Sequence, residues 1–212
     1  NNRSSGLHPK YRFVENIFEE LDSPNEWFLD TKKWLLYFYP EEGLVIENIQ
    51  KVEVGMLENL IFFEGDKDYP VHDIVLQNLI FQQSTPTFMK TEERLMRSDW
   101  TVYRSGAILL DGTENILIED NVFQDLGGNA IFVSNYNRNT TIKGNLIEEI
   151  GGSAISFVGN PDAVRSPSFN YHEFVPEVEI DTIPGPKTEN YPANSLVVDN
   201  LIRNIGTIEK QV

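Results

Sequence analysis

Short runs of alternating hydrophobic and polar residues recur along the middle of the chain at a nearly constant spacing. Ala107, Ala130 and Ala154 each open such a run, at offsets of 23 and then 24 residues. The runs are separated by Gly and Asn, and none has the residue spacing of an amphipathic helix. A repeat of this length is typical of stacked supersecondary units rather than of a closed globular core. We therefore predict an all-β fold in which each repeat forms one turn of a parallel β-solenoid.

Alternation within the repeat predicts which side chains point into the solenoid, because successive residues of a strand face opposite sides. The hydrophobic set of alternate positions is expected to point inward, and it consists of Ile108, Leu110, Ile131, Val133, Ile155 and Phe157. The other set of alternate positions is expected to point outward, and it consists of Ala107, Leu109, Asp111, Ala130, Phe132, Ser134, Ala154, Ser156 and Val158. This mixed outward column is either a binding surface or a surface packed under a loop.

Asparagines recur at one position of successive repeats. Asn121 and Asn145 lie 24 residues apart, and Asn78 and Asn200 are assigned to the same column. Stacked asparagine side chains hydrogen-bond to each other and to the backbone of neighbouring turns. We expect this column to be structural.

Residues 1–52 lie outside the repeat and are predicted to form an N-terminal cap. A short helix is predicted from the helical spacing of Val14, Ile17, Phe18 and Leu21. Two aromatic-rich runs, 26–30 and 34–40, are joined by a short polar connection and predict a β-hairpin. Its aromatic residues, Trp27 and Trp34 among them, suit a cover over the end of the solenoid as well as a sugar-binding surface.

The solenoid is predicted over residues 53–212, with two long interruptions at about 82–105 and 160–193. Loops of this length in a compact fold are usually functional. The first interruption enters just before the run at Ala107, and the second leaves just after the run ending at Val158. Both therefore border the outward column, and we expect them to enclose it as a cleft.

Charged and aromatic side chains in and beside the interruptions are the candidate substrate contacts. Such a mixture suits a sugar, because aromatic rings stack on its apolar face and charged groups bond to its hydroxyls. The candidates are Asp99, Trp100, Tyr103, Arg104, Asn135, Arg138, Arg165, His172, Lys187 and Tyr191. The alternative for each residue is that it only fixes a loop to the solenoid.

Four carboxylates are candidates for acid–base catalysis. Asp125 and Glu149 occupy one column of neighbouring turns, so their carboxylates would lie about 5 Å apart, near the separation found in retaining glycosidases. Such proximity would raise the pKa of one of them, as a general acid requires. The alternative is that both are exposed turn residues. Asp111 ends the outward run inside the expected cleft, and Glu209 lies where a further repeat would begin.

Composition restricts the partners more than the fold. The 33 acidic residues outnumber the 17 lysines and arginines, and the resulting net charge of −16 disfavours nucleic acid and anionic membrane surfaces as partners. There is no cysteine, and the three histidines are scattered without metal-ligand spacing. The chain contains no signal peptide and no membrane-spanning run. We expect no metal ion, no other cofactor and no membrane partner.

Four segments resemble the right-handed parallel β-helix proteins of the pectin-lyase-like superfamily, and they are 18–40, 97–139, 158–174 and 184–202. Within that superfamily the chain is most similar to secreted bacterial β-helix glycoside hydrolases. The resemblance implies a right-handed β-helix, a carbohydrate-active protein and a secreted or periplasmic location. We assign no catalytic residue of this chain from the resemblance. Such relatives continue with further turns, so the remaining C-terminal turns of a longer chain are also an expected partner.

The first functional hypothesis is a glycoside hydrolase that acts on an oligo- or polysaccharide through two carboxylates. The second is a polysaccharide lyase, which needs a basic proton acceptor and neutralisation of a uronate. Arg165 and Lys187 could supply those cations, although the net charge of the chain disfavours this hypothesis. The third is a carbohydrate-binding β-helix without catalysis.

Overall fold

The computed structural model describes most of the chain, namely residues 15–49, 51–88, 90, 93–94, 101–169 and 172–209. The chain divides into two compact units between Glu53 and Val54. Within the described residues there are β-strands and short 3₁₀ turns but no α-helix, and the all-β prediction is confirmed. No helix in this part of the chain is long and apolar enough to cross a membrane.

The N-terminal unit contains the predicted β-hairpin. Its strands β1 (Trp27–Asp30) and β2 (Leu35–Phe38) pair antiparallel. The rings of Phe28 and Tyr37 pack edge-on against Phe18, at centroid distances of 5.3 and 5.0 Å. An aromatic cluster thus holds the hairpin to the segment before it. That this unit caps the repeats stays a prediction.

The predicted helix of this unit is wrong for the residues that the structure describes. Only Phe18–Glu20 forms a turn of 3₁₀-helix, η1, and a second such turn, η2, covers Ile46–Asn48. No capping side chain supports either turn, and Asn16 before η1 has a left-handed φ of +57°. Because the first turn of a helix is costly to form, a short helical pattern without caps does not hold an α-helix. Val14 lies outside the described residues.

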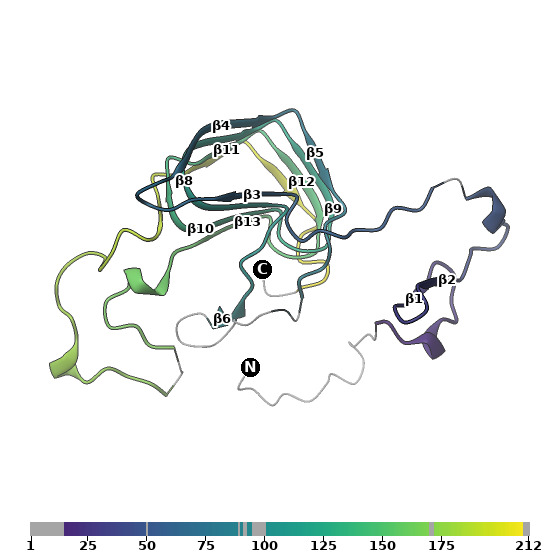
Figure 1. The fold of residues 1–212 in the computed structure, drawn as a ribbon, viewed down its shortest axis with the longest axis horizontal. Helices are drawn as coiled ribbons and strands as arrows, with labels where there is room; N and C mark the ends of the chain where they lie inside the picture. Colours follow the sequence, from purple (N-terminus) through teal and green to yellow (C-terminus); the bar gives the residue numbers. More distant parts are fainter. Residues whose placement is uncertain are drawn as a thin grey trace. The chain divides into compact units, whose positions relative to one another are not determined.

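In the described part of the C-terminal unit, four rows of strands form a stack, and each row passes through three faces (Figure 1). The first row consists of β3 (Ile61–Glu64), β4 (Val71–Gln77) and β5 (Ile80–Gln82). The second consists of β8 (Ile108–Glu119) and β9 (Val122–Leu126). The third consists of β10 (Ile131–Arg138), β11 (Thr141–Lys143) and β12 (Leu146–Ile150). The fourth consists of β13 (Ile155–Val158), β14 (Pro192–Ala193), β15 (Leu196–Val198) and β16 (Leu201–Arg203).

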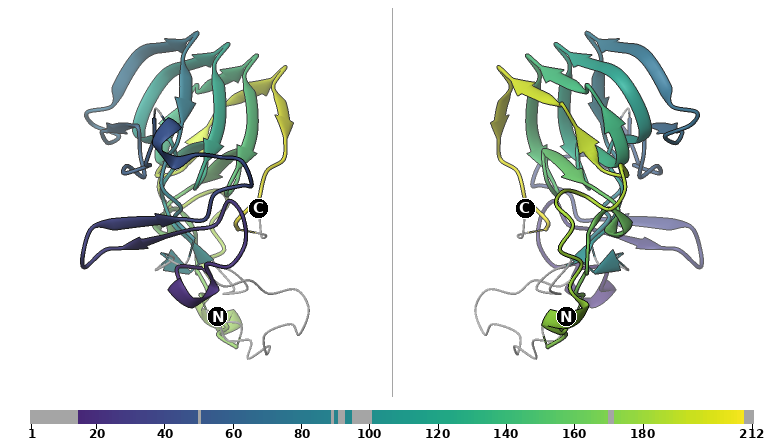
Figure 2. Two further views of the ribbon diagram at one scale, coloured as in Figure 1. Left: turned by 90° about the vertical axis from the view of Figure 1, so that its right-hand side faces the viewer. Right: turned by 90° about the vertical axis from the view of Figure 1, so that its left-hand side faces the viewer.

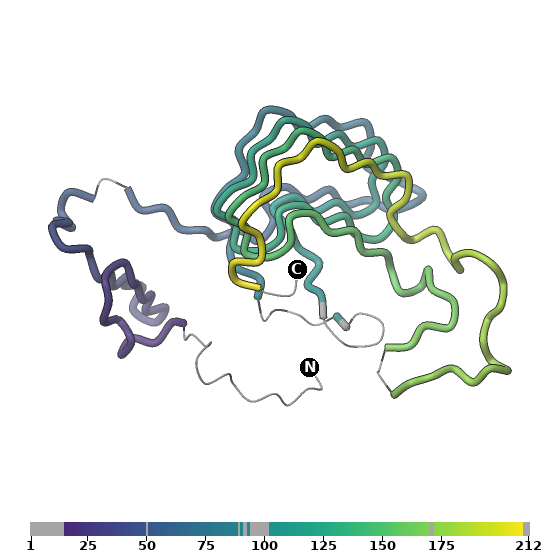
Figure 3. The backbone as a smooth tube through the Cα atoms, turned by 180° about the vertical axis from the view of Figure 1, so that it is seen from behind, coloured from purple at the N-terminus to yellow at the C-terminus, as the bar shows by residue number. Residues whose placement is uncertain are grey.

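Neighbouring rows pair in parallel, and the second, third and fourth rows have the register that the sequence predicts. On the first face, Ile131 lies between Ile108 and Ile155. On the third face, Leu146 of the third row lies opposite Val122 of the second. Figure 2 shows the rows side by side, and Figure 3 shows their nested course from behind. The repeat in the sequence is therefore a repeat of strand positions in space.

The interior of the stack is hydrophobic. The inward side chains predicted for the middle rows are fully buried, and they are Ile108, Leu110, Ile131 and Val133. On the third face the rings of Phe81 and Phe123 stack at 4.8 Å. Phe157 differs from the prediction, with 39% of its surface exposed. The reason is its place at the end of the stack, where β13 pairs with β10 and with no other described strand.

The outward column predicted at the start of each row is not an open surface. Ala107, Ala130 and Ala154 are buried and belong to the hydrophobic core. Each of them precedes a strand, so the strict alternation of strand faces does not extend to it. Leu109 and Phe132, which do lie in strands, are buried as well. The expectation of a cleft above these alanines is therefore corrected, because they are part of the core of the stack.

Each row turns its corners on residues in the left-handed backbone conformation. Successive members of these corner columns lie 42, 24 and 55 residues apart. The columns are Asp73, Asn115, Asn139 and Asn194, then Asn78, Asp120, Gly144 and Asp199, and finally Gln83, Asp125, Glu149 and Asn204. Asn, Asp and Gly adopt this conformation more readily than other residues. The corners thus explain why these residues separate the hydrophobic runs.

The asparagine column forms a hydrogen-bonded ladder. Asn145 Oδ1 accepts hydrogen bonds from the backbone N–H of Asn121, at 2.9 Å, and from its side-chain amide, at 3.1 Å. Asn200 Oδ1 accepts the same pair of bonds from Asn145. The assignment of Asn78 to this ladder is wrong. The first-row position is Leu79, whose N–H donates to Asn121 Oδ1, and Asn78 occupies the neighbouring corner position.

Replacing Asn145 by alanine is expected to lower the free energy of unfolding by about 2–4 kcal/mol, because buried backbone groups lose their partners. Asn145 is 1% exposed, and its amide also donates to the carbonyl of Ile118 at 3.0 Å. Asn200→Ala, at the half-buried end of the ladder, is expected to cost less. Urea denaturation of both variants measures the difference. An Asn145→Ala protein as stable as the parent would contradict the structural role.

Both interruptions of the stack contain short elements of their own. These are the antiparallel strands β6 (Glu93–Arg94) and β7 (Thr101–Val102), and the 3₁₀ turns η3 (Pro161–Ala163) and η4 (Glu177–Glu179). The second interruption closes at its base, where the N–H of Asn160 donates to the carbonyl of Asn190 at 2.8 Å. In Figure 3 it is the green-to-yellow loop that leaves the stack and returns to it. The fourth row therefore continues across this loop.

Candidate functional site

Where the first face ends, two adjacent rows each have an acidic residue followed by a glycine, at the same position. Glu64 of β3 is the register partner of Asp111 of β8, and each is followed by a glycine. A Cβ atom on Gly112 would lie 2.1 Å from the carbonyl carbon of Gly65, and Gly112 has a left-handed φ of +71°. The N–H of Gly65 donates to the carbonyl of Asp111 at 2.8 Å. Only glycine permits this close approach, which places two carboxylates on adjacent rows.

Amide side chains continue this polar line into the third and fourth rows. Asn135 Nδ2 donates to Asp111 Oδ2 at 2.8 Å, and Asn160 Nδ2 donates to Asn135 Oδ1 at 3.1 Å. Asn135 lies where the register between β8 and β10 shifts, between Ser134 and Asn137, and its φ is +57°. Such a bulge redirects a side chain. It brings the Asn135 amide to the carboxylate of Asp111.

Burial raises the pKa of Asp111 above its ordinary value, since a half-buried carboxylate loses hydration. Hydrogen bonds from Asn135 and Ser134 and the positive charge of Arg104 act in the opposite direction but do not cancel this effect. The negative charge of Glu64 raises the pKa further. Asp111 therefore retains its proton to a higher pH than an ordinary aspartate, as a general acid requires.

A hollow of about 570 Å³ lies beside this polar line. Its residues come from the first interruption, the third row and the second interruption, and they are Glu93, Arg104, Asn135, Asn160, Pro161 and Phe169. Asn135 belongs both to the hollow and to the hydrogen bond with Asp111. Carboxylate, guanidinium, amide and aromatic groups in one hollow suit a sugar. The hollow is therefore the candidate binding site, and Asp111 is the carboxylate connected to it.

Arg104 holds the segments around the hollow together. Its guanidinium donates two hydrogen bonds to Glu93, at 2.6 and 2.7 Å. It also donates to Ser134 Oγ at 3.0 Å and to the carbonyls of Val158 and Gly159 at 3.0 and 2.9 Å. These bonds join the first interruption to the third and fourth rows. Arg104 lines the hollow, but its hydrogen bonds are with the protein, so it positions the site.

Three other predicted contacts near the stack, Tyr103, Arg138 and Tyr191, are also bound to protein groups. The hydroxyl of Tyr103 donates to Glu58 at 2.6 Å. The guanidinium of Arg138 lies 4.4 Å from the ring centre of Tyr136 and 5.1 Å from that of Tyr191. Arg138 also donates to the carbonyl of Tyr191. These contacts favour the alternative that Tyr103, Arg138 and Tyr191 fix loops to the stack.

The remaining predicted contacts lie in the second interruption or outside the described residues. Arg165 donates to Asp181 at 2.6 Å and to two backbone carbonyls of the same loop. The backbone N–H of Lys187 donates to the carbonyl of Ala163, and His172 is exposed. None of these three lines the hollow. Asp99 and Trp100 lie outside the described residues.

The other predicted acids lie away from Asp111, on the third face and the turn after it. Asp125 and Glu149 are exposed corner residues with left-handed φ angles of +51° and +53°. Glu149 accepts a hydrogen bond from Asn204 at 2.7 Å, which favours the alternative of exposed turn residues. The N–H of Glu209 donates to the carbonyl of Gly151, and burial raises the pKa of the Glu209 side chain.

Sequence reasoning missed Glu64, Glu93 and Phe169 as site residues. Glu64 had a signal, because Phe63-Glu64-Gly65 ends its strand as Leu110-Asp111-Gly112 does, with a hydrophobic residue, an acid and a glycine. Glu93 lies in the two-residue strand β6 and Phe169 in an irregular segment, and in neither place does the repeat predict a position. Among the described residues, no group of three or more His, Cys, Asp or Glu side chains could hold a metal ion.

The raised pKa of Asp111 predicts a pH-dependent effect on stability. A carboxyl whose pKa is raised in the folded state contributes most below its unfolded pKa, and this contribution is lost as the pH rises through its folded pKa. Asp111→Asn, which still accepts the bond from Asn135, is therefore expected to melt at a higher temperature than the parent at pH 7. This difference should shrink below the ordinary pKa of 3.8. Thermal melts between pH 3 and pH 7 measure it.

Asp125→Asn is the matched control for this measurement, because Asp125 is exposed. Because its side chain is exposed at a corner, this substitution should change the melting temperature at pH 7 much less than Asp111→Asn does. If Asp111→Asn melts below the parent at pH 7 and above it at pH 3, the carboxylate is stabilised rather than penalised by its surroundings.

The comparisons agree with the architecture. Residues 68–171 match the family model described as a right handed beta helix region. This segment runs from the loop before β4 to beyond the end of β13, so it includes the whole second and third rows. No curated protein and no solved structure matches the chain. The family match supports a right-handed parallel β-helix over these residues.

Proposed function

We propose that this protein processes a polysaccharide and that it does so as a glycoside hydrolase. Asp111 is the general acid that protonates the glycosidic oxygen, and Glu64 is the second carboxylate. The hollow lined by Arg104, Asn135 and Phe169 holds the sugar, and Asn135 connects this hollow to Asp111. A polymeric substrate of this kind is met outside the cell, which is consistent with a secreted or periplasmic protein.

One observation carries the proposal: a half-buried aspartate with a raised pKa faces a glutamate on the adjacent row and is bonded to a residue of the hollow. Adjacent rows lie about 4.8 Å apart. This is close to the separation of about 5 Å at which the second carboxylate of a retaining glycosidase attacks the sugar directly. Asn135 supports the arrangement, because its amide bonds both to Asp111 and to Asn160.

A polysaccharide lyase is less well supported by the charges around the hollow. Of the described residues that line it, the one cation is Arg104, and its guanidinium is bonded to Glu93. A lyase needs a basic group to remove a proton and positive charge to neutralise a uronate. Arg165 and Lys187, the cations considered for that role, neither line the hollow nor bond to a residue that lines it, since their partners among the described residues lie within their own loop. The net charge of −16 also disfavours an acidic polymer.

The test is a product assay with neutral and acidic polysaccharides. The parent is expected to release reducing ends without an ultraviolet-absorbing unsaturated product, and Asp111→Asn should lose this activity while remaining folded. An unsaturated product would identify a lyase. Binding without turnover in the parent, on every polymer of the panel, would identify a non-catalytic carbohydrate-binding protein.

A further inference from the structure

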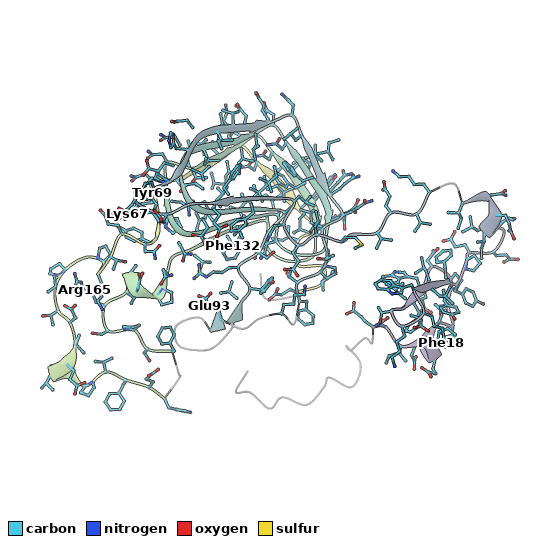
Figure 4. All side chains as sticks on the ribbon, viewed as in Figure 1. Phe18, Lys67, Tyr69, Glu93, Phe132 and Arg165 are labelled. Carbon is cyan, nitrogen blue, oxygen red and sulfur yellow. The ribbon has the colours of Figure 1, made fainter. Side chains whose placement is uncertain are left out.

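The first row contains a loop that the second row lacks. Ile61 of β3 pairs with Ile108, 47 residues later, whereas Val71 of β4 pairs with Thr113, 42 residues later. The first row therefore has five more residues between its first two faces than the second row. This loop presents Tyr69, whose surface is 82% exposed. Figure 4 shows Tyr69 beside Lys67 at this corner of the stack.

The loop holds Tyr69 in a defined position. Asp66 Oδ1 accepts hydrogen bonds from the N–H of Asp68 at 2.8 Å and from the N–H of Tyr69 at 2.7 Å. At the base of the loop, Gly65 packs directly against Gly112. A large, rigid and exposed aromatic ring loses little conformational freedom when it binds a ligand. Its exposure is therefore suited to contact with another molecule.

A second hollow, of about 520 Å³, adjoins this ring. Besides Tyr69 it is lined by polar side chains, among them Asp68, His72, Asp73, Glu114 and Asn115. Several of these are already oriented by protein groups. Asn115 donates to Asp73 at 3.1 Å, and the hydroxyl of Tyr136 donates to Glu114.

The charge of this hollow selects the class of ligand. Three carboxylates line it, whereas Lys67 forms an ion pair with Asp68 at 2.9 Å. Hydrogen bonds from His72 and Asn115 keep the pKa of Asp73 below its ordinary value, so this carboxylate stays an ionised acceptor at neutral pH. An acidic sugar would be repelled there. A neutral sugar would stack on Tyr69 and donate its hydroxyls to the carboxylates.

We propose that the Tyr69 hollow is a second carbohydrate-binding site, which takes residues of a neutral glycan chain. The proposal rests on the proposed function for its ligand class, and it adds a site and excludes uronate polymers. Glu114 lies three residues after Asp111 on the same strand, β8. A chain held at Tyr69 is thus attached to the two rows that carry Glu64 and Asp111.

The test is a titration of the 212-residue protein with cellohexaose, xylohexaose, mannohexaose and hexagalacturonate. Tyr69→Ala is expected to weaken binding of a neutral hexasaccharide about fivefold to tenfold, as the loss of one aromatic contact would. Phe174→Ala is the matched control, because Phe174 is 80% exposed but lines neither hollow, and it should bind like the parent. Thermal melts should show both variants folded.

The inference is overturned if Tyr69→Ala binds as tightly as the parent, if no neutral hexasaccharide binds, or if hexagalacturonate binds best. The proposed function fails separately. If the parent binds neutral hexasaccharides through Tyr69 but cleaves none of the polymers, the binding site stands and the hydrolase does not. If Tyr69→Ala keeps the parent KM and kcat on every substrate, the hydrolase stands and this site does not.

Discussion

Ile131→Asp is expected to lower the free energy of unfolding by about 4 kcal/mol or more, a large part of the total stability of an ordinary domain. Ile131 is fully buried in the core and lies between Ile108 and Ile155 on the neighbouring rows. A carboxylate at this position would lose its hydration and gain no partner. Circular dichroism during urea denaturation measures the loss.

Two variants make this result specific to burial. Ile131→Val removes one methylene group without adding charge and should cost about 1 kcal/mol. Leu201→Asp adds the same charge to a strand residue that is 58% exposed, and it should cost much less than Ile131→Asp. An Ile131→Asp protein that unfolds at the parent's urea concentration would show that the register of the stack is wrong.

The register of the stack could be predicted because it depends on local alternation repeated at a fixed interval. The change of offset from 23 to 24 residues also had a structural cause, since Asp111 pairs with Ser134 but Thr113 pairs with Asn137. One extra residue, the bulge that redirects Asn135, lies between these pairs. An irregular offset in such a repeat therefore predicts a bulge as well as a period.

The buried alanines could not be predicted in this way. Alternation along the sequence tells which side of the sheet a residue faces only when the residue lies in a strand. Ala107 lies at the corner before β8, where its N–H donates to the carbonyl of Asn129. Asn78 was misassigned for a related reason, because a corner residue and the ladder residue after it are both favourable positions for asparagine. The alternation rule separates inward from outward side chains along a strand, but it does not apply where the chain turns a corner.

The candidate site could be predicted in part. Asp111 was identified because it ends an outward run, whereas Glu64 was missed because five extra residues in the first row hide its alignment with Asp111. The roles of Arg104 and Arg165 depend on partners that the sequence does not indicate. Arg104 bonds to Val158, 54 residues away, and no periodic pattern joins an irregular segment to such a partner.

Asp111→Asn is expected to reduce kcat on the polysaccharide that the parent hydrolyses by about 10²–10⁴-fold, the usual contribution of a general acid. Sugar binding should change little, because Asn135 can still donate to the amide oxygen of the substituted residue. Glu64→Gln should also lower kcat, and the double variant should lose much less than the product of the two single losses, since the two carboxylates act as a unit. Asp125→Asn, on the third face, should retain the parent's kcat.

The pH dependence of kcat distinguishes an acid from a residue that only positions the substrate. Asp111 must be protonated to donate, so the parent's activity should fall as the pH rises through the pKa of Asp111. Burial and Glu64 raise that pKa, so the fall should lie above the ordinary aspartate value of 3.8. Glu64→Gln removes a negative charge that raises it and should move the fall to lower pH. In Asp111→Asn the residual activity should lack this fall. A residual activity that keeps the parent's pH profile would assign the proton transfer to another group.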